Sequence, residues 1–202
     1  MKIFCIGRNY VAHAKELNNK VPTQPLVFMK PQTALTYSEK VKYPSFSKDV
    51  HYEIEVVLHL SKGGHNIPLT KAGNYYNAIG LGIDYTARDV QARCKKKGHP
   101  WEMAKGYDNS ATLSASYSKK DYKMDNLSFA LDLNGQRVQA GNTKQLIFKF
   151  DYLIHYLSNI FTLEEGDVIY TGTPAGVGPV KPGDQLRAYL EGNLVLENYI
   201  IS

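Results

Sequence analysis

Residues 51–60, HYEIEVVLHL, form the stretch of sequence that decides the fold. Apolar and β-branched residues dominate it, which indicates a strand over Tyr52–Leu60. Side chains alternate across a strand, so Glu53 and Glu55 project from one face and Ile54 from the other. Two carboxylates on one face repel each other when they are partly buried, so they need cations or water around them. The stretch therefore predicts either a carboxylate site on a sheet or an exposed strand face.

Turn signals recur along the rest of the chain and separate further short strands. Asn134-Gly135 supplies the positive φ of a tight hairpin and joins Leu127–Leu133 to Gln136–Ala140. Gly192-Asn193 predicts a second hairpin. The other predicted strands are Lys2–Ile6, Leu26–Lys30, Ala78–Tyr85, Asp167–Thr173, Gln185–Leu190 and Leu194–Ile200. Glycines inside the apolar run Ala78–Tyr85 indicate a buried strand in close backbone contact.

Three helices are expected beside the strands. Apolar residues at three- and four-residue spacing over 146–160 predict the clearest one, with Thr143 as its N-cap. Thr86–Lys97 predicts a second helix that stops before Gly98. Tyr10–Asn18 is hardly longer than two turns, and a helix that short is marginal alone, which favours a mobile segment. The predicted fold class is therefore strand-rich α+β with a few peripheral helices, in a single domain over 1–202.

Composition narrows the class of protein. The 202 residues are 43% hydrophobic and 21% charged, which is typical of a soluble globular protein. The two cysteines, Cys5 and Cys94, give neither a disulfide framework nor a CxxC metal motif. No apolar run approaches the length of a membrane span. We expect a reducing, cytoplasmic setting and no membrane association.

The net charge of +5 and the pI near 9.0 permit nucleic-acid binding without indicating it, because no nucleic-acid motif or aromatic platform accompanies the charge. Basic residues cluster only at Arg93 and Lys95–Lys97. That cluster is interpreted either as a solvated helix end or as a patch that steers an anionic substrate.

A third acidic residue changes the meaning of Glu53 and Glu55. Asp84 falls where an apolar strand meets a helix start, a place suited either to a helix N-cap or to a site residue. Three carboxylates without clustered cysteines or histidines suit a hard cation, Mg²⁺ or Mn²⁺, better than zinc. The sequence therefore indicates an acidic metal site as one of its alternatives.

Two further features carry possible chemistry. His13 and Glu16 are three residues apart, so on a helix they share a face and make either a general base for water or a surface contact. Lys105 lies in a largely apolar stretch and needs a counter-charge or ligand if it is buried.

The glycine-rich run Thr171–Gly178, TGTPAGVG, can bring backbone N–H groups to an anion, or can simply form a turn. It ends without GK[ST] and lacks GxGxxG, so nucleotide binding is not indicated.

The order of these features resembles the fumarylacetoacetate hydrolase family, specifically its short branch of acylpyruvate hydrolases, oxaloacetate decarboxylases and diene-dioate isomerases. The matching stretches are GRNYVAHAKE (7–16), PLVFMKP (25–31), HYEIEVVLHL (51–60), GIDYTARDVQ (82–91), WEMAKGYD (101–108), GNTKQLIF (141–148) and EGDVIYTGTPAGVGPVKPGD (165–184). The resemblance implies the family's mixed β-sandwich roll and a homodimer.

The resemblance also implies roles for individual residues. Glu53, Glu55 and Asp84 occupy the metal-ligand positions, for Mg²⁺ or Mn²⁺. His13 and Glu16 match a water-activating dyad on a mobile lid, here residues 9–24. Lys105 matches the lysine that pairs with the metal site. Arg8, Gln91 and Thr173 match substrate contacts.

The activity implied is hydrolysis of a C–C bond in an acylpyruvate, such as acetyl- or fumarylpyruvate, through a metal-stabilised enolate. The substrate is then a small anionic 2-oxo acid. Decarboxylation of oxaloacetate and isomerisation of 2-hydroxyhepta-2,4-diene-1,7-dioate use the same kind of intermediate and stay as alternatives. A non-catalytic binding protein on the same fold is the alternative from another class. Two features depart from the family pattern. One is Tyr107, at a position where phenylalanine is common, and the other is the basic run 93–97.

Overall fold

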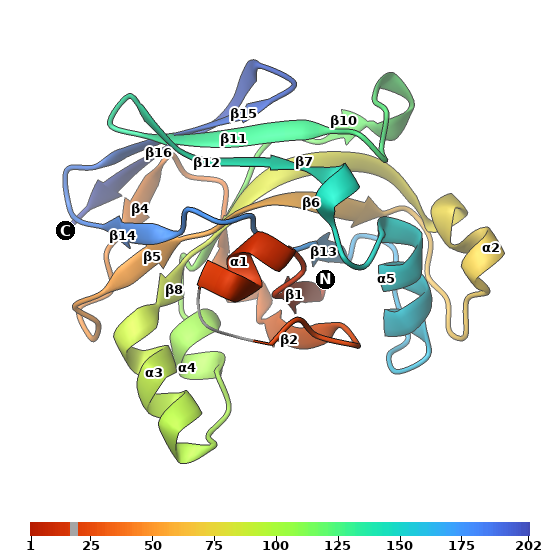
Figure 1. Cartoon of the computed structure of the whole chain (residues 1–202), viewed down its shortest axis with the longest axis horizontal. Coiled ribbons are helices and arrows are strands. Elements are labelled where there is room, and N and C mark those ends of the chain that lie inside the picture. Colours follow the sequence, from red (N-terminus) through yellow and green to blue (C-terminus); the bar gives the residue numbers. More distant parts are fainter. Residues whose placement is uncertain (17–19) are drawn as a thin grey trace.

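The computed structural model describes residues 1–16 and 20–202, and its strands form three sheets (Figure 1). The largest sheet contains β1 (Ile3–Gly7), β2 (Leu26–Lys30), β3 (Leu35–Thr36), β6 (Ile54–Leu60), β7 (Tyr76–Asp84), β9 (Ala111–Leu113), β10 (Tyr117–Ser118) and β13 (Val168–Tyr170). Its order is β2-β1-β13-β6-β7-β9-β3, with β10 also paired to β7. The central pair, β6 and β7, is antiparallel.

A second sheet packs over the first. It contains β4 (Lys40–Lys42), β11 (Ser128–Leu133), β12 (Gln136–Asn142), β15 (Gln185–Leu190) and β16 (Asn193–Ile201). Its order is β12-β11-β15-β16-β4. A small third sheet, ordered β14-β5-β8, consists of β5 (Val50–Tyr52), β8 (Thr86–Ala87) and β14 (Gly178–Val180).

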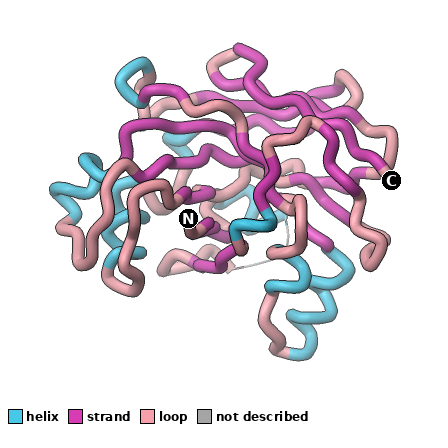
Figure 2. The backbone as a smooth tube through the Cα atoms, turned by 180° about the vertical axis from the view of Figure 1, so that it is seen from behind, coloured by secondary structure: helices cyan, strands magenta, loops and turns pink. Residues whose placement is uncertain are grey.

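The helices are short and lie around the sheets (Figure 2). The α-helices are α1 (Val11–Glu16), α2 (Leu69–Ala72), α3 (Arg88–Lys97), α4 (Glu102–Lys105) and α5 (Phe150–Ser158), and the 3-10 turns are η1 (Gln32–Ala34), η2 (Gly73–Tyr75), η3 (Lys119–Asp121) and η4 (Thr143–Gln145). Helices α3 and α4 form one lobe, and α2 and α5 pack together at the opposite end (Figure 1). The predicted strand-rich α+β class is confirmed.

The apolar core joins the two larger sheets. Leu58 and Leu81 on β6 and β7 belong to one buried cluster with Leu131 and Leu186 on β11 and β15. Each of these four side chains is fully buried, and burying a leucine contributes roughly 1.5–3 kcal/mol. The core therefore fixes β6 and β7, the two strands that carry the acidic residues.

The predicted close backbone contact along β7 is confirmed at Gly82. A Cβ atom there would lie 2.5 Å from Cε1 of Tyr170 and 2.7 Å from the carbonyl oxygen of Thr112. Only glycine leaves room for the Tyr170 ring against this strand.

The Asn134-Gly135 hairpin is also confirmed, with φ of 50° and 82° at the two turn residues. The second hairpin turns one residue earlier than predicted, at Glu191 and Gly192, because these two residues adopt φ of 47° and 83°. The strand predicted over Asp167–Thr173 is shorter, Val168–Tyr170.

The prediction of one helix over 146–160 was wrong in its first turn. The chain is extended there, because Ile147 N donates to Asn9 O (3.0 Å) and Phe148 N donates to Asn9 Oδ1 (2.7 Å). Asn142 caps the separate turn η4, so Thr143 is not the N-cap of α5; Lys149 holds that position. The periodic pattern arises from two elements in succession.

Two other helix predictions need smaller corrections. Thr86 and Ala87 form β8, so the second helix begins at Arg88. The predicted segment Tyr10–Asn18 contains α1, while Leu17 and Asn18 lie outside the described residues. The lid predicted over 9–24 includes these undescribed positions and stays a prediction. No helix in the described part of the chain has both the length and the apolarity needed to cross a membrane.

Candidate active site

The three predicted metal-binding carboxylates meet in the structure. Glu53 lies between β5 and β6, Glu55 lies on β6, and Asp84 ends β7. Pairing of Glu55 with Gly82 across β6 and β7 brings Asp84 beside the glutamates. One carboxylate oxygen from each residue lies within 4.8 Å of the others, and the residues are 6%, 2% and 0% exposed. The alternatives of an exposed strand face and of a helix N-cap at Asp84 are therefore wrong.

Buried cations compensate part of this acidic cluster. Lys105 is 3% exposed, and its Nζ lies 2.9 Å from Glu53 Oε2 and 2.6 Å from Asp84 Oδ2. The prediction that a buried Lys105 needs counter-charges is confirmed. Lys30 Nζ lies 2.8 Å from Asp84 Oδ1, and Arg88 Nη2 lies 2.5 Å from Glu53 Oε1. The cluster is thus an ion-pair network with three acids and three cations.

The network shifts the pKa values of the two glutamates in opposite directions. Burial alone would raise the pKa of Glu53, but the charges of Lys105 and Arg88 hold that pKa well below its usual range. Burial raises the pKa of Glu55 well above its usual range, and the carboxylate of Asp84 raises it further. Glu55 therefore lacks the positive charge that would stabilise its ionised form.

The donor set fits a divalent metal ion. Three clustered carboxylates with no nitrogen or sulfur donor suit a hard cation. A divalent ion at this place would also relieve the repulsion between the carboxylates of Glu55 and Asp84. Glu53, Glu55 and Asp84 are therefore the residues that would hold Mg²⁺ or Mn²⁺.

The glycine-rich run after β13 brings backbone N–H groups to anions of the protein itself. Gly172 N donates to Glu55 Oε2 (2.6 Å), and Gly176 N donates to Glu16 Oε1 (2.9 Å). Gly172 has φ of 107°, a conformation that favours glycine. The run therefore links one metal-site carboxylate to the second candidate pair, His13 and Glu16.

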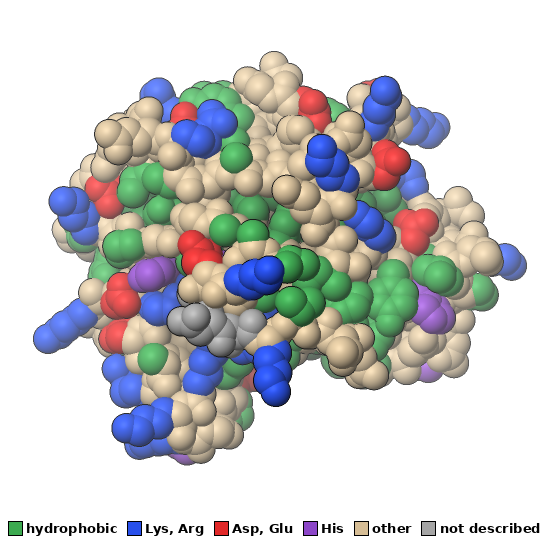
Figure 3. Space-filling view, in the orientation of Figure 1, with side chains coloured by type: hydrophobic (Ala, Val, Ile, Leu, Met, Phe, Trp, Pro, Cys, Tyr) green, Lys and Arg blue, Asp and Glu red, His purple; other side chains and the backbone are tan. Residues whose placement is uncertain are grey.

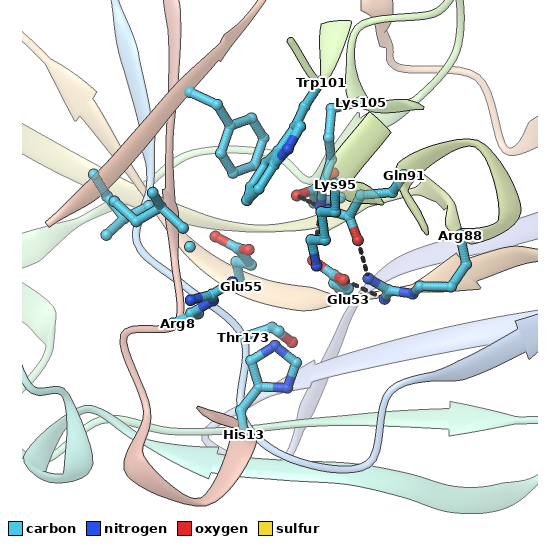
Figure 4. Close-up of a pocket in the computed structure, with 15 residues that line it drawn as sticks. Arg8, His13, Glu53, Glu55, Arg88, Gln91, Lys95, Trp101, Lys105 and Thr173 are labelled. Carbon is cyan, nitrogen blue, oxygen red and sulfur yellow. Dashed lines mark hydrogen bonds and ion pairs between the residues drawn. The ribbon is translucent and has the colours of Figure 1, made fainter. Parts of the chain in front are cut away.

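His13 and Glu16 lie on α1 and face each other. His13 Nδ1 is 3.2 Å from Glu16 Oε2, and His13 is 4% exposed although Glu16 is accessible. His13 lines the same cleft as the carboxylates (Figure 4). The arrangement can orient the imidazole and accept a proton at the nitrogen that points to the cleft.

The cleft brings together eight of the nine predicted site residues, all except Glu16. Of the predicted substrate contacts, Gln91 Oε1 accepts from Arg88 Nη1 (2.9 Å) and Thr173 Oγ1 accepts from Gln139 Nε2 (2.9 Å). Arg8 also lines the cleft. The remaining lining residues are Ile6, Gly7, Leu26, Phe28, Arg88, Lys95 and Trp101.

Sequence reasoning missed Lys30, Arg88 and Gln139 at this site, and it named Lys95 only as part of a basic run. Arg88 and Lys95 lie one helical turn before and after Gln91, so the helical period could have placed them on its face. Lys30 resembles any strand-end lysine, although it is buried behind Asp84. Gln139 donates to Thr173 and to the Pro174 carbonyl from a distant hairpin, and no local signal reveals this contact.

Comparisons with known proteins show the family of the chain. Residues 2–201 match the family described as fumarylacetoacetate (FAA) hydrolase C-terminal. The chain is 43% identical over 192 residues to the mouse (Mus musculus) mitochondrial oxaloacetate tautomerase, covering 94% of this chain and 87% of that protein. It is 42% identical to the mitochondrial oxaloacetate decarboxylase of Dictyostelium discoideum, covering 95% and 89% of the two chains.

A solved structure is also similar. The fumarylpyruvate hydrolase of Pseudomonas aeruginosa, in complex with Mn²⁺ and pyruvate, superposes with a TM-score of 0.93 at 34% identity, covering all of this chain and 89% of that one. The family match, the identities and the shared fold cover nearly the whole chain. The chain belongs to the fumarylacetoacetate hydrolase family.

Proposed function

We propose that this protein hydrolyses the C–C bond of an acylpyruvate with Mg²⁺ or Mn²⁺ held by Glu53, Glu55 and Asp84. The observation that carries the proposal is the His13–Glu16 pair, which stands at the same cleft as the buried acidic triad. A homodimer and a cytoplasmic location belong to the same proposal. The similarity to a fumarylpyruvate hydrolase with bound Mn²⁺ and pyruvate supports it.

The bound cation would polarise the 2-oxo group and stabilise the developing enolate. His13 accepts a proton from water, and Glu16 holds the imidazole in place. The water oxygen then bonds to the distal carbonyl carbon. The C–C bond between that carbon and the pyruvate methylene breaks, and its electron pair stays on pyruvate as the enolate. Protonation of the enolate carbon completes the release of pyruvate and a carboxylic acid.

Other residues of the cleft position the substrate. Thr173 Oγ1 accepts from Gln139, so its own hydroxyl proton is available to a substrate oxygen. Lys105 is held by Glu53 and Asp84 and presents a fixed positive charge beside the 2-oxo acid.

Conversion of oxaloacetate is the second candidate. It is favoured by identities of 42–43% to an oxaloacetate decarboxylase and an oxaloacetate tautomerase. Decarboxylation yields the same pyruvate enolate by loss of CO₂, without attack by water. The two candidates therefore differ in their need for a water-activating base.

Replacing His13 with alanine separates them, with His65→Ala at an exposed histidine as the matched control. We expect His13→Ala to lower pyruvate release from acetylpyruvate and fumarylpyruvate by about 10²-fold or more and to spare decarboxylation of oxaloacetate. Turnover of oxaloacetate alone by the wild type would favour the second candidate. Silence on all three substrates would reject acylpyruvate hydrolysis and oxaloacetate decarboxylation, and would leave tautomerisation of oxaloacetate, diene-dioate isomerisation or a non-catalytic protein.

A further inference from the structure

Positive charge in the cleft exceeds what the acidic triad uses. Three carboxylates and four cationic side chains line the cleft, the cations being Arg8, Arg88, Lys95 and Lys105. Arg88 and Lys105 are paired with the triad. Within residues 1–16 and 20–202, Arg8 and Lys95 have no carboxylate within ion-pair distance. A divalent cation at the triad would enlarge this surplus, so the cleft favours a ligand with more than one negative charge.

Lys95 borders an aromatic wall of the cleft. Its Nζ lies 5.2 Å from the centroid of the Trp101 ring. Trp101 and Phe28 lie with ring centroids 6.1 Å apart, and Lys105 Nζ lies 4.9 Å from the Phe28 centroid. The contacts therefore follow in the order Lys105, Phe28, Trp101 and Lys95, so two lysines flank the aromatic wall, which suits a ligand with two anionic groups on a short carbon chain.

Lys95 comes from the C-terminal part of α3, whose Lys and Arg side chains cover the lower left of the molecule in Figure 3. Lys96 and Lys97 on the same turn do not line the cleft, whereas Lys95 does. Lys95 is exposed like Lys96 and Lys97, but it is the lysine of this turn that also lines the site. Figure 4 draws Lys95 among the residues around the cavity.

Arg8 is, within the described part of the chain, the second unpaired cation of the cleft. It follows β1 with φ of 60°, a left-handed conformation that non-glycine residues rarely adopt. Burial, followed by the charges of Arg8, Arg88 and Lys105, lowers the pKa of Lys95 to about 8. Arg8 and Lys95 both line the cleft, and an anion bound beside them would relieve the repulsion among these cations.

We propose that Lys95, together with Arg8, binds the distal carboxylate of a dicarboxylic 2-oxo acid and so selects dicarboxylic over monocarboxylic substrates. This inference rests on the proposed function, which assigns the 2-oxo acid end of the substrate to the acidic triad. Fumarylpyruvate and oxaloacetate carry such a second carboxylate, and acetylpyruvate does not.

The test measures preference rather than absolute rate. In the Mn²⁺-loaded protein, kcat/KM for fumarylpyruvate is divided by kcat/KM for acetylpyruvate, for the wild type, Lys95→Met, Lys95→Arg and the control Lys96→Met. We expect Lys95→Met to lower this ratio about tenfold, the value of one charge-assisted hydrogen bond, and Lys95→Arg and Lys96→Met to preserve it. An equal ratio in Lys95→Met and the wild type would overturn the proposal, because Lys95 would then only cover Trp101.

Calorimetric binding separates this inference from the proposed reaction. 2-Oxoglutarate and 2-oxopentanoate have the same chain length and differ in the distal carboxylate. We expect the Mn²⁺-loaded wild type to bind 2-oxoglutarate about tenfold more tightly, and Lys95→Met to remove that difference. This result without turnover of any 2-oxo acid would reject the reaction and keep the carboxylate site. Turnover with no Lys95-dependent preference would keep the reaction and reject the site.

Discussion

Replacing Glu55 with glutamine should remove metal binding without destabilising the metal-free protein. The raised pKa of Glu55 means that the metal-free fold favours the neutral form of its carboxyl group, and a glutamine amide resembles that neutral form. The carbonyl oxygen of the glutamine can still accept from Gly172 N, as Glu55 Oε2 does at 2.6 Å. We therefore expect Glu55→Gln in EDTA to unfold at or slightly above the temperature of the wild type.

Glu53→Gln is the matched contrast, because Glu53 is ionised and faces Lys105 and Arg88. Removing one partner of a buried ion pair costs about 3–5 kcal/mol. In a domain of this length each kcal/mol shifts Tm by about 2–4 °C. Glu53→Gln should therefore lower Tm in EDTA by about 6 °C or more, although the two substitutions change the same chemical group on the same stretch of chain.

Added Mn²⁺ completes the comparison. At a concentration of 100 times Kd, an ion that binds only the folded state contributes about 2.7 kcal/mol, or a rise in Tm of about 5–11 °C. The wild type should show this rise, and Glu55→Gln should lose most of it. The measurement is thermal unfolding by circular dichroism with EDTA or with MnCl₂. A fall in Tm for Glu55→Gln in EDTA as large as that for Glu53→Gln would refute the reasoning.

The raised pKa of Glu55 also predicts how the stability difference between Glu55→Gln and the wild type changes with pH. A carboxyl group whose pKa is raised on folding stabilises the fold at pH values below its unfolded pKa, which is 4.5 for Glu55. This stabilisation is lost as the pH rises toward the folded pKa. In EDTA, Glu55→Gln should therefore gain stability relative to the wild type as pH increases above about 4.5. A constant difference between pH 4 and 8 would contradict the raised pKa.

Three further predictions concern residues around the site. Gln139→Leu should lower the free energy of unfolding in urea by about 2 kcal/mol, because buried groups that include Thr173 lose their partner; an unchanged midpoint would contradict this. Lys30→Met should lower the free energy of unfolding by about 3 kcal/mol, because Asp84 loses a buried cation. A decrease below about 1 kcal/mol would mean that Lys105 alone compensates the charge of Asp84. Because the pKa of Lys95 is about 8, its charge is lost as the pH rises from 7 to 9. The KM of the wild type for fumarylpyruvate should therefore increase over that pH range, and the KM of Lys95→Arg should change less. Equal pH profiles of KM in the two proteins would contradict this prediction.

The sequence predicted the structure correctly where local backbone rules and side-chain chemistry act together. Alternation over HYEIEVVLHL placed Glu53 and Glu55 on one side of the strand, and the strand end placed Asp84 beside them, as the structure has it. Asn134-Gly135 determined a hairpin because its backbone preference is intrinsic to the two residues.

Other features depend on contacts between distant segments. The helix expected over 146–160 lost its first turn to hydrogen bonds with Asn9, more than 130 residues away in the chain. Lys30 and Gln139 reach the site from distant strands, and no spacing rule marks them. Lys95 was visible as part of a basic run, but only the path of α3 shows which lysine of that run reaches the cleft.

The most direct test of metal-dependent 2-oxo acid chemistry in this protein is a metal titration of pyruvate release. The protein is stripped with EDTA, and Mn²⁺ or Mg²⁺ is returned in steps with acetylpyruvate, fumarylpyruvate or oxaloacetate as substrate. We expect no release without metal, and a rate that rises to a plateau at one ion per chain for at least one acylpyruvate. Release that is indifferent to EDTA, or a Glu55→Gln variant with the activity and the metal response of the wild type, would contradict the assignment of the acidic triad as the metal centre.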